Sequence, residues 1–427
     1  MADAKNFTNM RSLMLGLARA MNLVSPEVER HHEQAAYLSL FVARQMGLPE
    51  DQVVLALYSA LLHDIGSIMT EAPQTVAEIE SNIHEVAREG SRMLRDLPGF
   101  ADISSVIAYS ECSWTDTVAC GIAEGQTCER LGRIASIVHL SDVVSLMVGS
   151  SRPDEGPDSL RVLNRAKDIR KAVEACRGTE FCPEVVDAFL EVSAAEYVWM
   201  DLAHNPGFLT YFTGDIAPVS LQDALRLTGF MSRIIDSRSP FTAMHSAGVA
   251  ASAHQLALLC GLDEECAMQV AIAGNLHDVG KLAVPREILE KPGKLTEAEF
   301  NIVKEHPYYT SLVLLNIDGF EDIRHWACNH HEKLNGHGYP FRYGPDDLDQ
   351  GDRIMAVADV FSAITEVRPY RDGMDREQAA RVLNDDAKAG AICPDTVALL
   401  MENYDRVDAA RDQASRAAGK RYFESLA

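Results

Sequence analysis

One segment of this sequence occurs twice, and this repeat constrains the possible folds more than any other feature. Shifted by 214 residues, positions 25–66 align with positions 239–280 without a gap, and 12 of the 42 aligned positions are identical. A second match, at a shift of 211, aligns residues 181–184 with residues 392–395. Matching segments so far apart indicate two copies of one domain.

The length of the chain agrees with two domains. At 427 residues it exceeds what one ordinary hydrophobic core holds together. Turn-forming residues gather at Asn205-Pro206-Gly207 and Thr213-Gly214, between the two copies. We therefore predict a first domain over residues 1–200, a linker over 201–220 and a second domain over 221–427.

Helical periodicity dominates both copies. Segments 220–236 and 356–367 carry apolar residues at intervals of three and four. Segment 265–280 is apolar nearly all round, which is typical of a buried helix. No stretch alternates between polar and apolar residues for long enough to predict a sheet. We expect an all-α fold of tandem helical domains without a substantial β-sheet.

Charge and composition exclude several classes of protein. The net charge of −24 argues against nonspecific binding to nucleic acid, which needs a basic surface. No apolar run reaches the roughly 20 residues of a membrane helix, and the N-terminus lacks the pattern of an export signal. The nine cysteines form no CxxC pair and fit reduced thiols. We expect a cytoplasmic protein with no membrane partner, and a homodimer as the default assembly.

Histidines and aspartates in the second copy form a pattern that indicates a metal centre. His277-Asp278 ends a buried apolar helix, where an unpaired charge would be costly. Three ionisable residues stand next to one another at His330-His331-Glu332, and there is little structural reason for them to converge. A set of five imidazoles and two carboxylates suits Fe, Mn, Ni or Zn better than Ca or Mg. The candidate ligands are His245, His277, Asp278, His306, His330, His331 and Asp359.

With these motifs in order, the second copy resembles the HD-GYP branch of the HD phosphohydrolase superfamily along residues 221–427. A lone His-Asp doublet would be weak support, but the ordered set with a Gly-Tyr-Pro loop is specific. The matching residues are His277-Asp278-Val279-Gly280-Lys281, His306-Pro307, residues 330–340 (HHEKLNGHGYP), Asp359 and Arg368-Pro369-Tyr370-Arg371.

The resemblance implies how two divalent transition-metal ions would be held. His245, His277, Asp278 and Asp359 would hold one ion, and Asp278 would bridge to a second ion on His306, His330 and His331. A hydroxide between the ions would then attack phosphorus in line. On this view Asp278, Lys281 and His277 are the catalytic residues. The implied substrate contacts are Lys281, Arg368, Arg371, Gly338, Tyr339 and Pro340.

The same resemblance implies bacterial second-messenger signalling through hydrolysis of a cyclic dinucleotide. Members of the family act mostly on cyclic di-GMP, and some act on 3′,3′-cyclic GMP-AMP. Two alternatives stay open. The chain could be a scaffold that docks diguanylate-cyclase-type partners through its Gly-Tyr-Pro loop, or a phosphohydrolase of mononucleotides.

Some positions depart from the pattern or fall outside it. Family members with three metals carry a glutamate four residues before the first histidine, and Phe241 at that position predicts two metals. Asn335-Gly336 replaces a common Asp-Gly and should keep the turn. We expect His254 and His325 to lie outside the site, and His337 remains a possible substrate contact.

The first copy retains only part of the metal pattern. His31, His63, Asp64 and Asp142 keep the ligand types for one ion. The histidine pair is replaced near Ser110, the Gly-Tyr-Pro loop is missing, and Lys281 corresponds to Ser67. His84 is a candidate match for His306, at the cost of an eight-residue gap. We expect no phosphodiesterase chemistry here but a regulatory or dimerising domain. The residues alone do not decide whether this domain binds an ion or whether His31 and His32 are surface residues.

Overall fold

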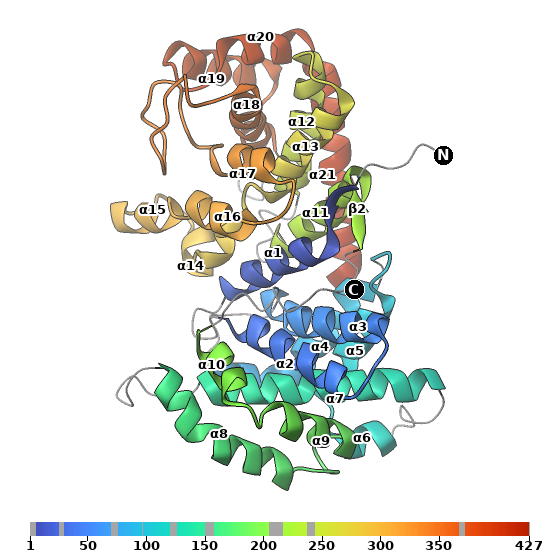
Figure 1. The fold of residues 1–427 in the computed structure, drawn as a ribbon. Coiled ribbons are helices and arrows are strands. Elements are labelled where there is room, and N and C mark those ends of the chain that lie inside the picture. Colours follow the sequence, from blue (N-terminus) through green and yellow to red (C-terminus); the bar gives the residue numbers. More distant parts are fainter. Residues whose placement is uncertain are drawn as a thin grey trace. The chain divides into compact units, whose positions relative to one another are not determined.

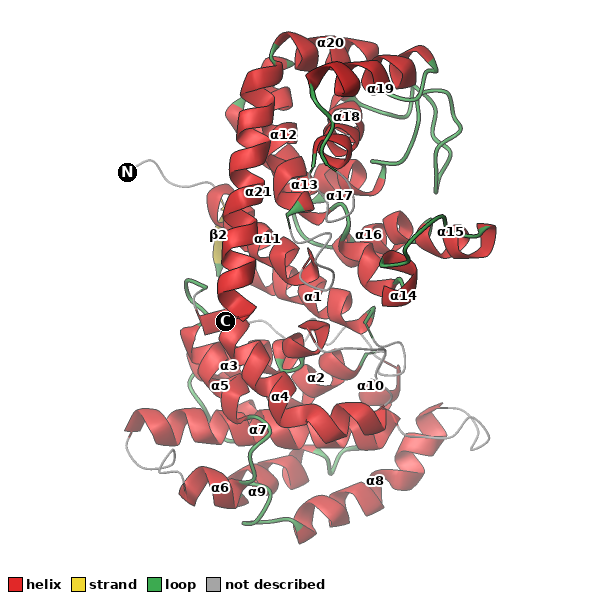
Figure 2. Cartoon of the chain, turned by 180° about the vertical axis from the view of Figure 1, so that it is seen from behind, coloured by secondary structure: helices red, strands yellow, loops and turns green. Residues whose placement is uncertain are grey.

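The structure is a computed structural model of the full chain. It describes residues 6–24, 30–69, 76–95, 97–119, 126–149, 158–204, 217–236, 244–366 and 372–426. The described residues are almost entirely helical (Figure 1), and strands appear only as a short two-stranded antiparallel sheet. The same predominance of helices is visible from behind (Figure 2). The predicted all-α fold is confirmed.

The chain folds into two compact units. The C-terminal unit comprises residues 1–23 and 217–427, and the N-terminal unit comprises residues 24–216. The described elements of the C-terminal unit are β1 (Asn6–Asn9), α1 (Met10–Asn22), β2 (Pro218–Ser220), α11 (Leu221–Asp236), α12 (His245–Leu259), α13 (Glu264–Leu276), η5 (Val279–Ala283), α14 (Arg286–Leu289), α15 (Glu297–Val303), α16 (His306–Leu314), α17 (Glu321–Cys328), α18 (Gln350–Thr365), α19 (Arg376–Lys388), α20 (Pro394–Glu402) and α21 (Tyr404–Leu426). Those of the N-terminal unit are α2 (His31–Gln45), α3 (Glu50–Leu62), η2 (Ile65–Met69), α4 (Val76–Arg95), α5 (Ala101–Tyr109), α6 (Trp114–Ala119), α7 (Gln126–Gly149), α8 (Asp158–Ala175), α9 (Pro183–Val192) and α10 (Glu196–His204).

The repeat in the sequence is also a repeat of helices. Helices α2 and α3 and the 3-10 helix η2 begin 214 residues before α12, α13 and η5. In the second match, α9 begins 211 residues before α20, and each helix has proline at its first position. Two domains of common design therefore follow each other in the chain.

The N-terminal residues belong to a different unit from the one we expected. We predicted that residues 1–200 form the first domain, but β1 pairs with β2 and α1 packs against α16 and η5 of the C-terminal unit. A Cβ atom on Gly16 would lie 2.6 Å from Ile317, so the contact between α1 and this unit is close. Because the repeat begins only at residue 25, it carried no information about this segment.

Among the described helices, one stretch is long and apolar enough to cross a membrane. It is Arg130–Gly149 in α7, and 72% of its most apolar 18-residue window is buried inside the structure. Helix α7 packs against α2, α3 and α5 and carries core residues such as Ile137 and Val144. Its apolar character therefore serves the core of the N-terminal unit.

Candidate metal centre

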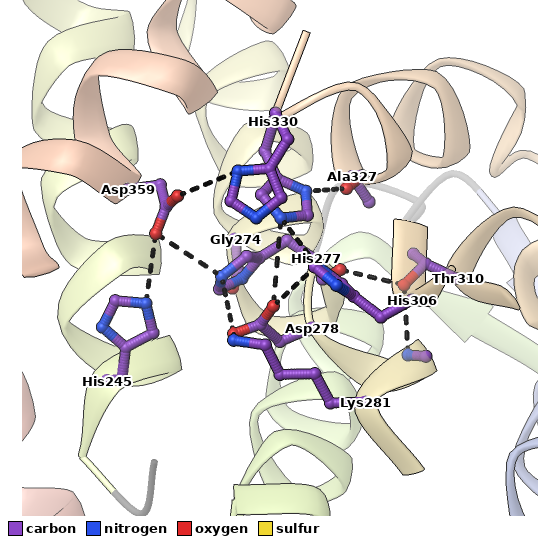
Figure 3. A network of polar contacts seen from close by, with 12 residues as sticks. His245, Gly274, His277, Asp278, Lys281, His306, Thr310, Ala327, His330 and Asp359 are labelled. Atoms are coloured by element: carbon purple, nitrogen blue, oxygen red, sulfur yellow. Dashed lines mark hydrogen bonds and ion pairs between the residues drawn. The ribbon is translucent and has the colours of Figure 1, made fainter. Parts of the chain in front are cut away.

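The structure brings the seven predicted ligands together in one cluster of the C-terminal unit. Figure 3 labels all of them except His331. Most of them lie at helix ends. His245 and His306 are the first residues of α12 and α16, and His277 directly follows α13. Asp359 projects from within α18, and His330 lies two residues beyond the end of α17. Five segments therefore converge on one point.

One group of ligands surrounds Asp359 and one oxygen of Asp278. His245 Nε2 lies 3.1 Å from Asp359 Oδ1, and His277 Nε2 lies 3.9 Å from the same oxygen. His277 Nε2 also lies 3.2 Å from Asp278 Oδ2. His245, His277 and Asp359 each offer a ligand atom within 4.8 Å of the others, which is close enough for one ion.

A second group surrounds the other oxygen of Asp278. His306 Nε2 lies 3.4 Å and His330 Nε2 lies 3.9 Å from Asp278 Oδ1. The two Nε2 atoms are 3.2 Å apart, and His331 offers a third imidazole within 4.8 Å. Asp278 thus turns one oxygen toward each group, which is the arrangement a carboxylate needs to bridge two ions.

Backbone carbonyls orient three of the imidazoles. Their Nδ1 atoms lie at hydrogen-bonding distance from the carbonyl oxygen three residues earlier, at 2.8 Å for His277 and at 2.7 Å for both His306 and His330. A proton on Nδ1 leaves the lone pair of Nε2 pointing into the cluster. Such a hydrogen bond on the far nitrogen is common for histidines that bind metal.

The buried atoms of the cluster fit a cation. His277 Nε2 and Asp278 Oδ1 are buried and make no hydrogen bond within the described residues. Burial lowers the pKa of His306 to about 3 and that of His330 to about 4, so both are neutral near pH 7 and able to donate a lone pair. Asp278 stays ionised, because His277 and Lys281 outweigh the effect of its burial and keep its pKa well below the usual range.

His245 has a different electrostatic environment. Burial lowers its pKa, but hydrogen bonds to Asp359 and Glu366 outweigh this effect and raise the pKa to about 10. The Nδ1 atom of His245 lies 3.5 Å from Glu366 Oε2, so a carboxylate takes the place that backbone carbonyls have at the other histidines. Sequence reasoning missed Glu366. Glu366 follows Asp359 by seven residues, which is two helical turns, and this spacing could have indicated that both carboxylates face the same side of the helix.

Two members of the cluster also face solvent. The side chains of Lys281 and His331 are 24% and 29% exposed, whereas those of the other ligands are at most 12% exposed. Lys281 Nζ lies 2.6 Å from Asp278 Oδ2. A substrate would therefore reach the cluster on the side of Lys281 and His331.

The Gly-Tyr-Pro loop lies against this open side. The ring of Tyr339 packs 4.8 Å from that of His331. The buried carboxylate of Glu332 accepts hydrogen bonds from the amides of residues 341, 342 and 343 at 2.6, 3.1 and 3.2 Å. A Cβ atom on Gly338 would lie 2.4 Å from the α-carbon of Glu332, so only glycine fits there. The loop, which also carries Pro340, is thus tied to the residue that follows the histidine pair.

The remaining predicted residues lie in several places. Arg368, Arg371 and Phe241 fall outside the described residues. His254 bonds to Glu264 and His325 to Asp352, away from the ligand groups. His337 is exposed in the loop, where Asn335 Oδ1 accepts from its amide and Gly336 has a positive φ of 72°, so the predicted turn is present.

Comparison with protein families assigns the fold to a known group. Two models described as HD domains match the chain, one over residues 28–147 and the other over residues 229–393. Each lies within one of the two copies. Both halves of the chain are HD domains. The predicted pair of HD domains is therefore confirmed, and the seven predicted metal ligands lie within the second match.

Named relatives of the tandem HD chain hydrolyse cyclic dinucleotides. The 3′3′-cGAMP-specific phosphodiesterase 1 of Vibrio cholerae is 26% identical over 92% of this chain and 92% of its own length. A cyclic di-GMP phosphodiesterase of Pseudomonas aeruginosa is 33% identical over 53% of this chain and 52% of its own. A solved structure of a cyclic GMP-AMP specific phosphodiesterase from V. cholerae superimposes with a TM-score of 0.63 at 20% identity, covering 93% and 98% of the two chains, and so shares the fold.

The N-terminal HD domain has other residues at the positions of the second ligand group. A Cβ atom on Gly280 would lie 1.9 Å from the carbonyl oxygen of His306, and one on Gly66 would lie 2.0 Å from that of Val86. Val86 therefore corresponds to His306. The suggested match of His84 is wrong, because His84 lies two residues earlier on α4 and is exposed.

The histidine pair is replaced as well. His330 Nδ1 contacts the carbonyl oxygen three residues earlier, and Ser110 Oγ donates to the carbonyl oxygen of Ile107 in the same way. Ser110 thus takes the place of His330, and Glu111 that of His331. These replacements agree with the expectation that the first copy lacks the second group of metal ligands.

Proposed function

We propose that the C-terminal HD domain is a binuclear-metal phosphodiesterase that hydrolyses a cyclic dinucleotide. The observation that carries the proposal is the division of Asp278, whose two oxygens face two separate groups of imidazoles. His245, His277 and Asp359 would hold one ion, and His306, His330 and His331 the other. When bound, the two ions would supply Lewis acidity and an activated water for in-line displacement at phosphorus.

The chain's own residues would prepare this reaction. Asp278 is held ionised by His277 and Lys281, and carbonyls keep three Nε2 atoms aimed inward. Lys281 stands at the exposed side, where its ammonium group can meet a phosphate oxygen. Tyr339 lies beside His331 at the same opening and offers an apolar surface for a base or ribose.

Among cyclic dinucleotides we propose 3′,3′-cyclic GMP-AMP ahead of cyclic di-GMP, the substrate of most members of the family that the sequence resembles. Two relatives that match more than 90% of this chain are named as specific for cyclic GMP-AMP. The cyclic di-GMP phosphodiesterases match about half of it or less. The preference for the mixed dinucleotide rests on these two matches over nearly the whole chain. A cytoplasmic location, where such messengers act, belongs to the same proposal.

The test is hydrolysis by full-length protein purified without oxygen and loaded with Fe, Mn, Ni or Zn in turn. Cyclic GMP-AMP, cyclic di-GMP and mononucleotides are offered, and products are separated by liquid chromatography. We expect a linear dinucleotide from cyclic GMP-AMP. Asp278→Asn should abolish it, and His254→Gln, a histidine of the same unit outside the ligand groups, should leave it unchanged. No linear product with any metal would exclude the proposed activity, and loss of cellular function in Asp278→Asn would speak against a pure scaffold.

A further inference from the structure

The N-terminal HD domain contains a buried cluster of three histidines and two aspartates. His31, His32 and His63 are 4%, 2% and 1% exposed, so the possibility that His31 and His32 are surface residues is excluded. Their ring centroids lie 5.1 to 5.4 Å from one another. Asp64 and Asp142 are also buried, at 8% and 2% exposure.

The three imidazoles converge on one carboxylate oxygen. The Nε2 atoms of His31, His32 and His63 lie 3.7, 3.7 and 3.3 Å from Asp64 Oδ2. Asp142 Oδ1 closes the other side, 2.8 Å from His31 Nε2 and 3.3 Å from His63 Nε2. His31, His63 and Asp64 each offer a ligand atom within 4.8 Å of the others, a spacing that fits a single divalent ion.

Two of the imidazoles are fixed by partners on their outer nitrogens. His63 Nδ1 lies 2.8 Å from the carbonyl oxygen of Ala60, as His277 Nδ1 does from that of Gly274. His31 Nδ1 lies 2.6 Å from Ser145 Oγ. Both contacts direct Nε2 toward the aspartates, which is how outer partners orient histidine ligands.

Charge also favours an ion in this cluster. Asp64 and Asp142 are two buried carboxylates, and burial of charge without opposite charge close by is expensive. One divalent cation balances both. A second ion has too few ligands, because Val86 and Ser110 stand where the C-terminal unit has His306 and His330.

We propose that the N-terminal HD domain binds one divalent transition-metal ion through His31, His63, Asp64 and Asp142, with His32 as an additional ligand. The repeat aligns His32 with Ser246, so this donor has no counterpart in the C-terminal site. The ligands come from α2, the junction of α3 with η2, and α7. The ion therefore ties three segments of this unit together and stabilises it, without the second ion that the proposed hydrolysis requires.

The experiment counts metal in the full chain after the C-terminal ligands are removed. The variant His277→Asn/Asp278→Asn/His330→Asn, which has lost a ligand from each ligand group of the C-terminal unit, is loaded with Zn or Co, freed of loosely bound ions on a chelating resin and analysed by mass spectrometry. We expect about one ion per chain, held by the closed set of ligands. Addition of His63→Asn should remove it, and addition of His84→Gln, an exposed histidine of the same unit, should not.

His32 is tested separately in the same background. His32→Gln should weaken the affinity for Co by roughly tenfold or more and change the visible absorption of the Co-loaded protein. Circular dichroism checks that each variant is folded, and the His32 variant keeps the test valid if His63→Asn does not fold. No retained ion in the parent variant would overturn the site. Unchanged affinity and spectrum in His32→Gln would overturn the role of His32. Neither readout depends on hydrolysis by the C-terminal unit.

Discussion

Replacement of Gly280 by alanine tests whether the close approach of η5 to α16 positions the candidate metal centre. A Cβ atom at residue 280 would lie 1.9 Å from the carbonyl oxygen of His306 and 2.7 Å from the amide nitrogen of Thr310. Both are backbone atoms, so no side chain can rotate away. To reach the 3.4 Å at which ordinary contact begins, α16 would have to move by about 1.5 Å.

This movement has two measurable consequences. Overpacking a core costs about 1–3 kcal/mol. We expect a loss of about 3 kcal/mol in the free energy of unfolding, because the backbone of α16 has to move. His306 would also move away from Asp278, which now lies 3.4 Å from it. A displacement of about 1 Å can slow a reaction about 100-fold, so kcat should fall at least that far.

Urea denaturation followed by circular dichroism measures the first effect, and chromatography of the linear dinucleotide measures the second. Gly229→Ala is the matched control in the same unit. Its Cβ atom would lie 3.5 Å from the nearest atom, Asn275 Nδ2, and alanine in a helix interior should add about 0.5–1 kcal/mol of stability without changing activity. A Gly280→Ala protein with the urea midpoint and kcat of the parent would refute the reasoning.

Three further predictions concern the same site. Glu332→Gln removes the charge from an acceptor of three backbone amides and should cost about 1.5–3 kcal/mol of loop stability, seen as faster amide hydrogen exchange over residues 341–343. Lys281→Gln should lower kcat about 100-fold, and the urea midpoint of the metal-free protein should fall as well, because the buried carboxylate of Asp278 loses the ammonium group 2.6 Å away. The pKa of His245 is raised from 6.5 to about 10, so its protonation stabilises the metal-free protein fully below pH 6.5, and this contribution is lost as the pH rises toward 10. Metals bind the neutral imidazole, so calorimetry should find proton release and an affinity that increases across the same window; a pH-independent affinity would contradict this assignment.

Much of the site could be predicted because its residues are rare in buried helices and occur in a fixed order. The doublet His277-Asp278 and the pair His330-His331 stand out in an apolar context, and the repeat placed the first doublet on His63-Asp64. The helix end that carries the doublet recurs at the shift of 214 that the sequence predicts. Local periodicity and spacing are enough for such features.

Other features needed contacts between segments far apart in the chain. His84 looked like the partner of His306, but α4 presents Val86 to Gly66, because the rotation of a helix is set by what it packs against. Residues 1–23 join the C-terminal unit through β2 and α16, and no repeat or motif marks that choice.

The sequence by itself determined the helical class, the duplication and the chemical types of the metal ligands, since each depends on residue identity and spacing. Only the tertiary structure decided which oxygen of Asp278 faces which imidazoles, and that His32 turns inward beside His31. Directions of side chains depend on the packing of helices that are distant in sequence. The repeat therefore predicted where a metal could be bound, and the packing of each copy determines how many ligands reach it.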